Sequence, residues 1–197
     1  MYRQRQEGLD LSNTAGFSLI LLSMRDLFKE HSMSDSAFQA QRAVRTYRQT
    51  VDAKPEVVFP LLCPVREAEW LDGWNFRMIY SVGGLVEEGA VFSTSKPGEE
   101  DTVWVVTRHD AAQRCVEFTR FTSDSRTCIL KIAVAALGDD RSRVDISYAY
   151  TSIGPAGSRF IELWSEKEFL DAVTFWEASM NHFLKTGKKL PRYEQSN

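Results

Sequence analysis

The chain has 197 residues and a formal charge of -3, with a pI near 5.7. This length allows one domain with a substantial core and is short for two ordinary domains. The acidic balance gives no broad basic field, so nucleic acid is not an expected partner. The three cysteines, Cys63, Cys115 and Cys128, are odd in number and have no CxxC spacing. They argue against a disulfide framework or a zinc site and favour a cytoplasmic protein.

An N-terminal extension, residues 1–41, is predicted to carry an amphipathic helix near residues 16–30. Its apolar residues recur at helical spacing and form one stripe: Phe17, Ile20, Leu21, Met24, Leu27 and Phe28. The apolar run is too short to span a bilayer, and acidic residues stand where a signal peptide is basic, so no membrane span is expected. Two interpretations stay open. Either the helix docks on its own domain, on a second copy or on a partner, or Met33 is the real start of the protein.

A strand over residues 42–51 opens the predicted domain, and residues 55–62 have helical composition. Pro60 should shorten or kink that helix, because proline fits a helix without cost only in its first turn. The segment Cys63–Trp74 then brings tryptophans, acids, a base and a thiol close together. Aromatic contact area with interleaved charge is typical of a small-molecule site, so this segment is expected to be a wall of a pocket.

Six further strands are predicted, separated by short turns rich in glycine, aspartate and serine. They cover residues 76–82, 90–95, 102–109, 114–122, 127–136 and 143–151. Their close succession indicates an antiparallel meander. The facing of strand 102–109 stays open, because Trp104 and Val106 are as apolar as their neighbours and a bulge would exchange the faces. A register without a bulge predicts that the inner face carries Val103, Val105, Thr107 and His109.

The last three strands cross-check one another, because residues opposite each other in an antiparallel pair share a face. The two turns pair Leu130 with both Phe118 and Tyr148, and they pair Cys128 with both Arg120 and Tyr150. The predicted inner face consists of Val116, Phe118, Leu130, Ile132, Val134, Val144, Ile146, Tyr148 and Tyr150. Arg120 is the one charged residue that these registers place on that face.

A long helix closes the predicted domain, and its start is well marked. Ser165 and Glu168 form a capping box, and Trp164 can pack on Phe169 as a hydrophobic staple. The apolar stripe of the helix consists of Phe169, Val173, Trp176, Met180 and Phe183 or Leu184. Gly187 ends a helix of about 20 residues, which at about 30 Å is long enough to cross a sheet. Residues 191–197 are expected to be a tail.

This order of elements resembles the SRPBCC superfamily, whose members are START-like and polyketide-cyclase-like helix-grip domains. The phrases that carry the resemblance are Ala53–Phe59, Cys63–Trp74, Tyr80-Ser81 before Gly83-Gly84, and Phe183–Gly187. The resemblance covers residues 42–190. The most similar members of the superfamily are bacterial proteins of no assigned activity. The resemblance implies an α+β helix-grip fold. In that fold a curved antiparallel sheet of about seven strands wraps around a long C-terminal helix, with two short helices after the first strand.

Members of this superfamily bind lipids, polyketides, hormones and other apolar molecules, and some are cyclases or hydrolases. The resemblance therefore implies a cavity for an apolar or aromatic small molecule, and it transfers no catalytic residue. One alternative is a cofactor-free cyclase, aromatase or hydrolase that uses Glu67 and Arg120. A second alternative is an interaction module that acts through the N-terminal helix. No cofactor or metal is expected, because phosphate-loop, dinucleotide, GxSxG and HExxH patterns are absent from the sequence.

The predicted ligand site consists of Glu67, Trp70, Trp74, Phe118, Arg120, Tyr148, Tyr150, Phe169, Val173 and Trp176. Trp70 and Trp74 either line the pocket or plug the end of the barrel as core. A buried Glu67 would have a raised pKa suited to proton transfer, and an exposed one would pair with Arg66 or another base. Arg120 either meets an acid or a ligand oxygen, or lies at the rim and reaches water. A catalytic role for Cys63 would need a histidine beside it.

Overall fold

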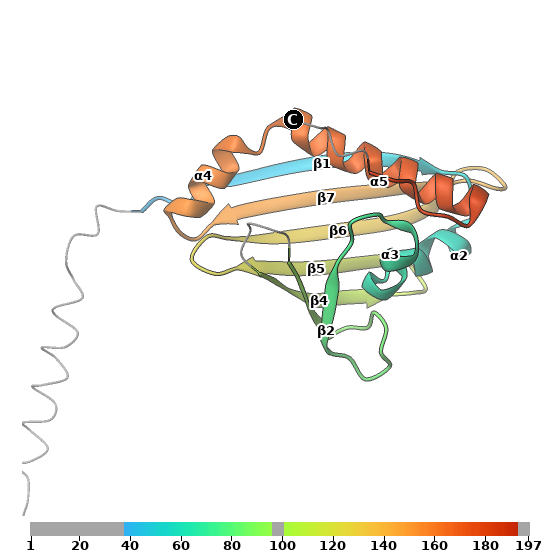
Figure 1. Ribbon diagram of the computed structural model, residues 1–197, viewed down its shortest axis with the longest axis horizontal. Helices are drawn as coiled ribbons and strands as arrows, with labels where there is room; N and C mark the ends of the chain where they lie inside the picture. The colour runs from blue at the N-terminus through green and yellow to red at the C-terminus, as the bar shows by residue number, and fades with distance from the viewer. Residues whose placement is uncertain (1–37, 96–100, 193–197) are drawn as a thin grey trace, which may run out of the picture. The chain divides into compact units, whose positions relative to one another are not determined.

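The computed structural model describes residues 38–95 and 101–192 of the chain. The amphipathic helix predicted near residues 16–30 and the end of the tail lie outside the described residues. A single antiparallel sheet forms the body of the domain, and a long helix lies across it (Figure 1). This arrangement confirms the predicted helix-grip fold class.

The sheet has seven strands in the order β1-β7-β6-β5-β4-β3-β2. Their bounds are β1 (Arg42–Val51), β2 (Phe76–Tyr80), β3 (Val91–Thr94), β4 (Thr102–Asp110), β5 (Cys115–Thr122), β6 (Arg126–Ala136) and β7 (Ser142–Ser152). Strands β2 to β7 follow one another as a meander, and β1 pairs with β7. The connections are short, which is typical of antiparallel neighbours.

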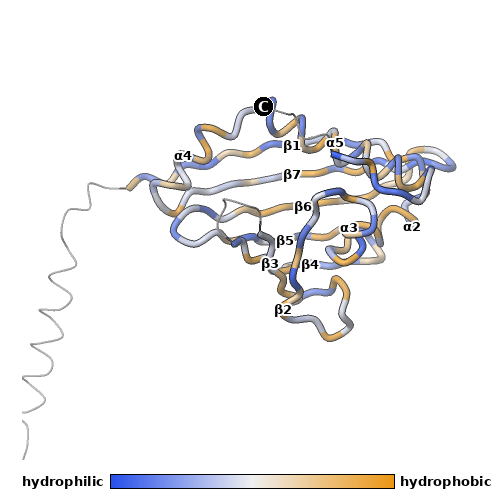
Figure 2. The backbone as a smooth tube through the Cα atoms, viewed as in Figure 1, coloured by the Kyte–Doolittle hydropathy of each residue, from blue (hydrophilic) through white to orange (hydrophobic). Residues whose placement is uncertain are grey.

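The predicted registers of β5, β6 and β7 are confirmed. Leu130 pairs with both Phe118 and Tyr148, and Cys128 pairs with both Arg120 and Tyr150. The apolar residues of these strands alternate with polar ones, as the tube in Figure 2 shows by colour along the strands. One face of the sheet therefore supplies the core and the other meets solvent.

Strand β4 contains the bulge that the sequence left open. The register with β5 shifts between Val106 and Arg108. Trp104 and Val106 are buried before the shift. The outward residues before the shift are Val103, Val105 and Thr107, so the regular register was wrong for them. The extra residue exchanges the faces, and His109 then turns inward as predicted.

Short helices follow β1: α2 (Pro55–Val58), the 3₁₀ helix η1 (Phe59–Leu62) and α3 (Pro64–Trp70). A proline occupies the first turn of each, where its missing N–H costs no hydrogen bond. Pro60 accordingly divides the predicted first helix into α2 and η1, which confirms the expected interruption.

Helix α5 (Glu166–Thr186) has the ends that the sequence predicted. Ser165 and Glu168 form the complete capping box. The rings of Trp164 and Phe169 lie 5.6 Å apart as the predicted staple. Gly187 ends the helix with a φ of 69°, a left-handed conformation that glycine adopts without strain.

Side-chain and backbone groups of β1 hold α5 along one edge of the sheet. The buried amide of Gln49 donates to the backbone carbonyl of Val173 at 2.9 Å. The hydroxyl of Tyr47 donates to Glu177 at 2.9 Å, and the backbone N–H of Thr50 donates to the same carboxylate at 2.8 Å. These long-range bonds fix which face of α5 looks onto the concave side of the sheet.

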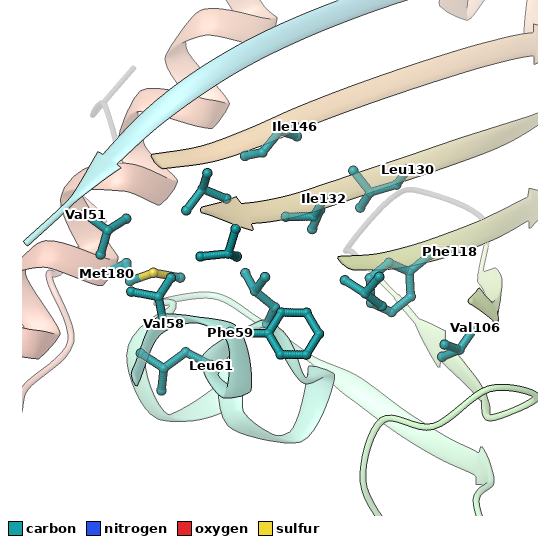
Figure 3. Packing of buried hydrophobic residues seen from close by; sticks show 14 of the residues in the cluster. Val51, Val58, Phe59, Leu61, Val106, Phe118, Leu130, Ile132, Ile146 and Met180 are labelled. Atoms are coloured by element: carbon teal, nitrogen blue, oxygen red, sulfur yellow. The ribbon is translucent and has the colours of Figure 1, made fainter. Parts of the chain in front are cut away.

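The hydrophobic core fills one end of the space beneath α5. Val58, Phe59 and Leu61 from α2 and η1 pack against Ile132 and Ile146 of the sheet (Figure 3). The other end of the sheet carries helix α4 instead, so the two ends are closed by different helices (Figure 1).

Helix α4 (Pro155–Leu163) was not predicted. Its start, Gly154-Pro155, looks like a turn in sequence, and the helix is only nine residues long. Gly157 lets it approach the start of β6: a Cβ on Gly157 would lie 1.8 Å from the carbonyl oxygen of Ser125. A glycine at this position is therefore a condition for docking α4.

Gly157→Ala is expected to destabilise the fold by about 1–3 kcal/mol, measured by urea unfolding. The alanine gains about 1 kcal/mol of helix propensity, but the added methyl group meets a backbone carbonyl that cannot rotate away. Gly83→Ala is the matched control, because its Cβ would meet only the Glu87 side chain at 3.6 Å. Equal stability of the two variants would contradict the proposed docking constraint.

Candidate functional site

A cavity of about 340 Å³ lies between the concave face of the sheet and the N-terminal half of α5. Small-molecule sites span about 300–1,000 Å³, so this cavity is at the small end of that range. The sheet contributes Phe118, Arg120, Leu130, Tyr148 and Tyr150 to its wall, and α5 contributes Phe169, Val173 and Trp176. The wall is largely aromatic, with a few polar groups among the rings.

Most of the predicted site residues meet at this cavity. They are Glu67, Trp74, Phe118, Arg120, Tyr148, Tyr150, Phe169, Val173 and Trp176. Trp70 does not reach the cavity: it is fully buried, and its indole N–H donates to the carbonyl of Leu61 at 3.0 Å. The structure thus places Trp70 in the core behind the wall, and Gly73, with a φ of 75°, makes the turn that separates it from Trp74.

Several lining residues were missed from the sequence. They include Phe92, Trp104, Arg126, Phe160, Trp164, Phe175 and Arg192. Trp104 was missed because the bulge in β4 hid its facing. Phe160 and Trp164 were missed with α4, although their i, i+4 spacing is a helical signal that could have been found.

Glu67 reaches the cavity because α3 turns one face inward. Pro64, Glu67 and Trp70 recur every three residues, and all three are buried. The Glu67 carboxyl makes no hydrogen bond or ion pair with any described residue, and burial raises its pKa to about 8. Arg66 instead pairs with Glu69 at 2.6 Å, so the predicted alternative of a Glu67–Arg66 pair is wrong.

Arg120 lies between aromatic rings on the inner face. Its guanidinium carbon is 4.7 Å from the ring centroid of Trp104 and 5.6 Å from that of Tyr150. Its Nη1 donates to the Tyr150 hydroxyl at 3.0 Å. The buried Nε–H has no acceptor in the described part of the chain. The guanidinium is therefore held by π contacts and one neutral hydrogen bond, and Glu67 is not its counterion there.

Two tyrosines extend the polar part of the wall. The rings of Tyr148 and Tyr150 stack with centroids 6.2 Å apart. Burial raises the pKa of Tyr150 to about 12 and also raises that of Tyr148, so both hydroxyls stay neutral and can donate. The Tyr148 hydroxyl makes no hydrogen bond with the described residues, which leaves it available to a ligand.

Helix α4 closes the cavity next to Tyr150. The rings of Tyr150 and Trp164 lie 4.6 Å apart. The guanidinium of Arg126 sits 3.7 Å from the Phe160 ring centroid, and Arg45 donates to the backbone carbonyl of Trp164 at 2.7 Å. Cation–π and hydrogen-bond contacts thus tie α4 to the strands.

Among the described residues, Cys63 and His109 make separate contacts. Cys63 is buried and its sulfur accepts a hydrogen bond from the backbone N–H of Val86 at 3.2 Å. His109 stacks on Phe59 with centroids 5.4 Å apart. Within residues 38–95 and 101–192, no group of His, Cys, Asp and Glu side chains is arranged to hold a metal ion.

A second hollow lies on the outer face of the sheet. Its charged residues neutralise one another: Arg48 pairs with Asp145 at 2.7 Å, and Lys131 pairs with Glu117 at 2.9 Å. Salt bridges satisfy the charges that line this hollow. The aromatic cavity, whose wall holds polar groups without such partners among the described residues, is therefore the better candidate site.

No protein-family model and no curated protein matches this chain. Solved structures do match it, and norcoclaurine synthase from Thalictrum flavum has a TM-score of 0.57 and 16% identity, covering 76% of this chain and 98% of its own. The Zhui aromatase/cyclase from Streptomyces sp. R1128 has a TM-score of 0.54 and 11% identity, covering 77% and 100%. Ara h 8.0201 has a TM-score of 0.52 and 14% identity, covering 74% and 100%.

At these identities the likeness shows the fold alone. This chain has the Bet v1-like helix-grip fold that these structures share. Among the described residues, every helix is too short or too polar to cross a membrane.

Glu67→Gln is expected to change how stability depends on pH. Because folding raises the pKa of Glu67 from 4.5 to about 8, the folded protein keeps a proton that the unfolded chain releases between these values. Stability supplied by the neutral carboxyl is therefore full below about pH 4.5 and is lost as pH rises toward 8. Relative to Glu67→Gln, the wild type should lose up to about 1.4 kcal/mol per pH unit in this window.

Urea unfolding at several pH values between about 5 and 8 measures this difference. Glu69→Gln is the matched control, because Glu69 lies two positions further along the same helix and is half exposed. Its stability should depend on pH as that of the wild type does. Parallel curves for Glu67→Gln and the wild type would show that Glu67 titrates as an ordinary surface carboxyl.

Proposed function

We propose that this protein binds an apolar or aromatic small molecule, such as a lipid or polyketide, in the cavity between the sheet and α5. The observation that carries the proposal is a largely aromatic cavity wall with a few polar groups, from Glu67, Arg120 and Tyr148. Aromatic rings supply contact area for an apolar body, and the polar groups orient one end of it. The resemblance to the SRPBCC superfamily supports the same function.

The proposal includes the division of the chain into an extension (1–41), a ligand-binding domain (42–190) and a tail (191–197), and a cytoplasmic location. The alternative of an interaction module rests on the N-terminal helix, outside the described residues. It needs a filled core, and the cavity argues against that.

Two alanines on α5 provide a matched test. Ala172 lines the cavity, and Ala178 is exposed elsewhere on the same helix. Ala172→Trp puts an indole at the wall and is expected to weaken binding of the neutral probe 2-naphthylmethanol by about tenfold or more. Ala178→Trp carries the same change away from the cavity and should bind as the wild type does. Isothermal titration calorimetry measures the affinities.

Both variants place a tryptophan on an exposed site, so loss of folding does not confound the comparison. The result against the proposal is a wild-type protein that does not bind the probe, or two variants that bind it equally well.

A second function, a cofactor-free cyclase, aromatase or hydrolase, is favoured by one observation. A carboxyl with a pKa near 8, that of Glu67, lines the same cavity as the guanidinium of Arg120. Glu67 could remove a proton next to a carbonyl that Arg120 polarises. Norcoclaurine synthase, which shares the fold, has been solved with dopamine and hydroxybenzaldehyde, and Zhui is an aromatase/cyclase.

Deuterium exchange into the methyl group of 2-acetonaphthone, followed by NMR, tests this chemistry. The wild type should accelerate exchange, and the rate should rise with pH toward about 8 as Glu67 ionises. Glu67→Gln should lower the enzymatic rate by about 10²–10⁴-fold, the usual contribution of a general base. Glu69→Gln should leave it unchanged, and a wild type without acceleration would exclude this function for an aryl ketone.

A further inference from the structure

Several charged side chains of the described residues line the cavity. Three guanidinium groups, from Arg120, Arg126 and Arg192, face it with two carboxyl groups, from Glu67 and Asp72. Asp72 already accepts a hydrogen bond from the backbone N–H of Arg192 at 2.9 Å. Burial keeps Glu67 protonated at neutral pH, so this carboxyl adds no negative charge to the described part of the wall.

Arg120 is the group with the most unused capacity for an anion. Its Nη1 donates to the neutral Tyr150 hydroxyl at 3.0 Å. Its buried Nε–H has no acceptor in residues 38–95 and 101–192, and no described carboxylate lies within salt-bridge distance of it. Partial burial removes water from the guanidinium at a cost in free energy, and π contacts offset only part of that cost.

Neutral donors line the same cavity. Tyr148 lies on β7, two strands from Arg120 on β5, and its hydroxyl makes no hydrogen bond with the described residues. A protonated Glu67 carboxyl also donates a hydrogen bond. Donors that line one cavity with a guanidinium that has no described carboxylate partner suit an oxygen anion, whereas a cationic amine would meet like charge.

We propose that the ligand of this cavity is an aromatic oxyanion, a carboxylate or phenolate of about two fused rings, whose charged oxygen pairs with Arg120. The rings would lie against Phe169 and Trp176 of α5. A cavity of about 150 Å³ accepts benzene, and this one, at about 340 Å³, is roughly twice as large. The inference rests on the proposed ligand-binding function and specifies the charge of the ligand.

Three ligands with the same ring and different charge test it: 2-naphthoate, 2-naphthylmethanol and 2-naphthylmethylamine. Calorimetric titration near pH 7 is expected to show 2-naphthoate binding about 10- to 100-fold more tightly than the alcohol, as a charge-assisted hydrogen bond to a partly buried guanidinium predicts. The amine should bind most weakly. High salt should leave part of the preference in place, because a partly buried pair is screened less than a surface pair.

Arg120→Gln should abolish the preference for 2-naphthoate while the alcohol still binds. Arg120→Lys keeps the charge, so it should retain part of the preference. Arg48→Gln, on the outer face of the sheet and paired with Asp145 at 2.7 Å, is the matched control and should bind as the wild type does. Thermal midpoints of the variants report whether each is folded.

Equal binding of all three ligands would overturn the inference and leave the proposed function in place. A preference for the amine would also overturn it and would assign Glu67 as the partner of the ligand. If none of the three binds, the inference fails. In that case the failure of 2-naphthylmethanol to bind also counts against the proposed function, because that function is tested with this neutral probe alone.

Discussion

The position of α5 is the constraint on which the rest of the structure depends. Buried and half-buried hydrogen bonds from Gln49, Tyr47 and Thr50 hold it along β1. A purely apolar contact would let a long helix slide or roll, whereas directional bonds between residues about 124–130 positions apart in sequence fix both its axis and its face. The C-terminal half of α5 then completes the core through Met180, and the N-terminal half stands over the cavity.

The cavity exists because the two ends of the domain are filled differently. Helices α2, η1 and α3 insert apolar side chains under one end of the sheet. At the other end α4 contacts β6 and β7, and the ring of Trp164 meets those of Tyr150 and Phe169 edge to face. Polar groups on this wall, Glu67 and Arg120, are left without a strong partner among the described residues. Folding removes water from these groups at a cost in free energy, and a bound ligand can offset part of that cost.

Local patterns in the sequence predicted the sheet registers and the ends of α5. Two short turns related Cys128 to both of its neighbours, and the capping box of Ser165 is complete within four residues. The facing of Trp104 depended on a bulge, which follows from packing between strands and which an apolar pattern on both faces does not reveal. Helix α4 depended on the close approach at Gly157, a contact with β6 that nothing in its own nine residues signals.

The candidate site was predictable where it followed from strand register, as for Phe118, Arg120, Tyr148 and Tyr150.

The central claim, an occupied aromatic cavity, is tested most directly by native mass spectrometry of the protein purified from its own host, with extraction of any bound molecule. The account predicts a mass increase that disappears on denaturation and an extract that contains an acidic aromatic compound. A clean mass of the unmodified chain, with nothing released on denaturation, would contradict it.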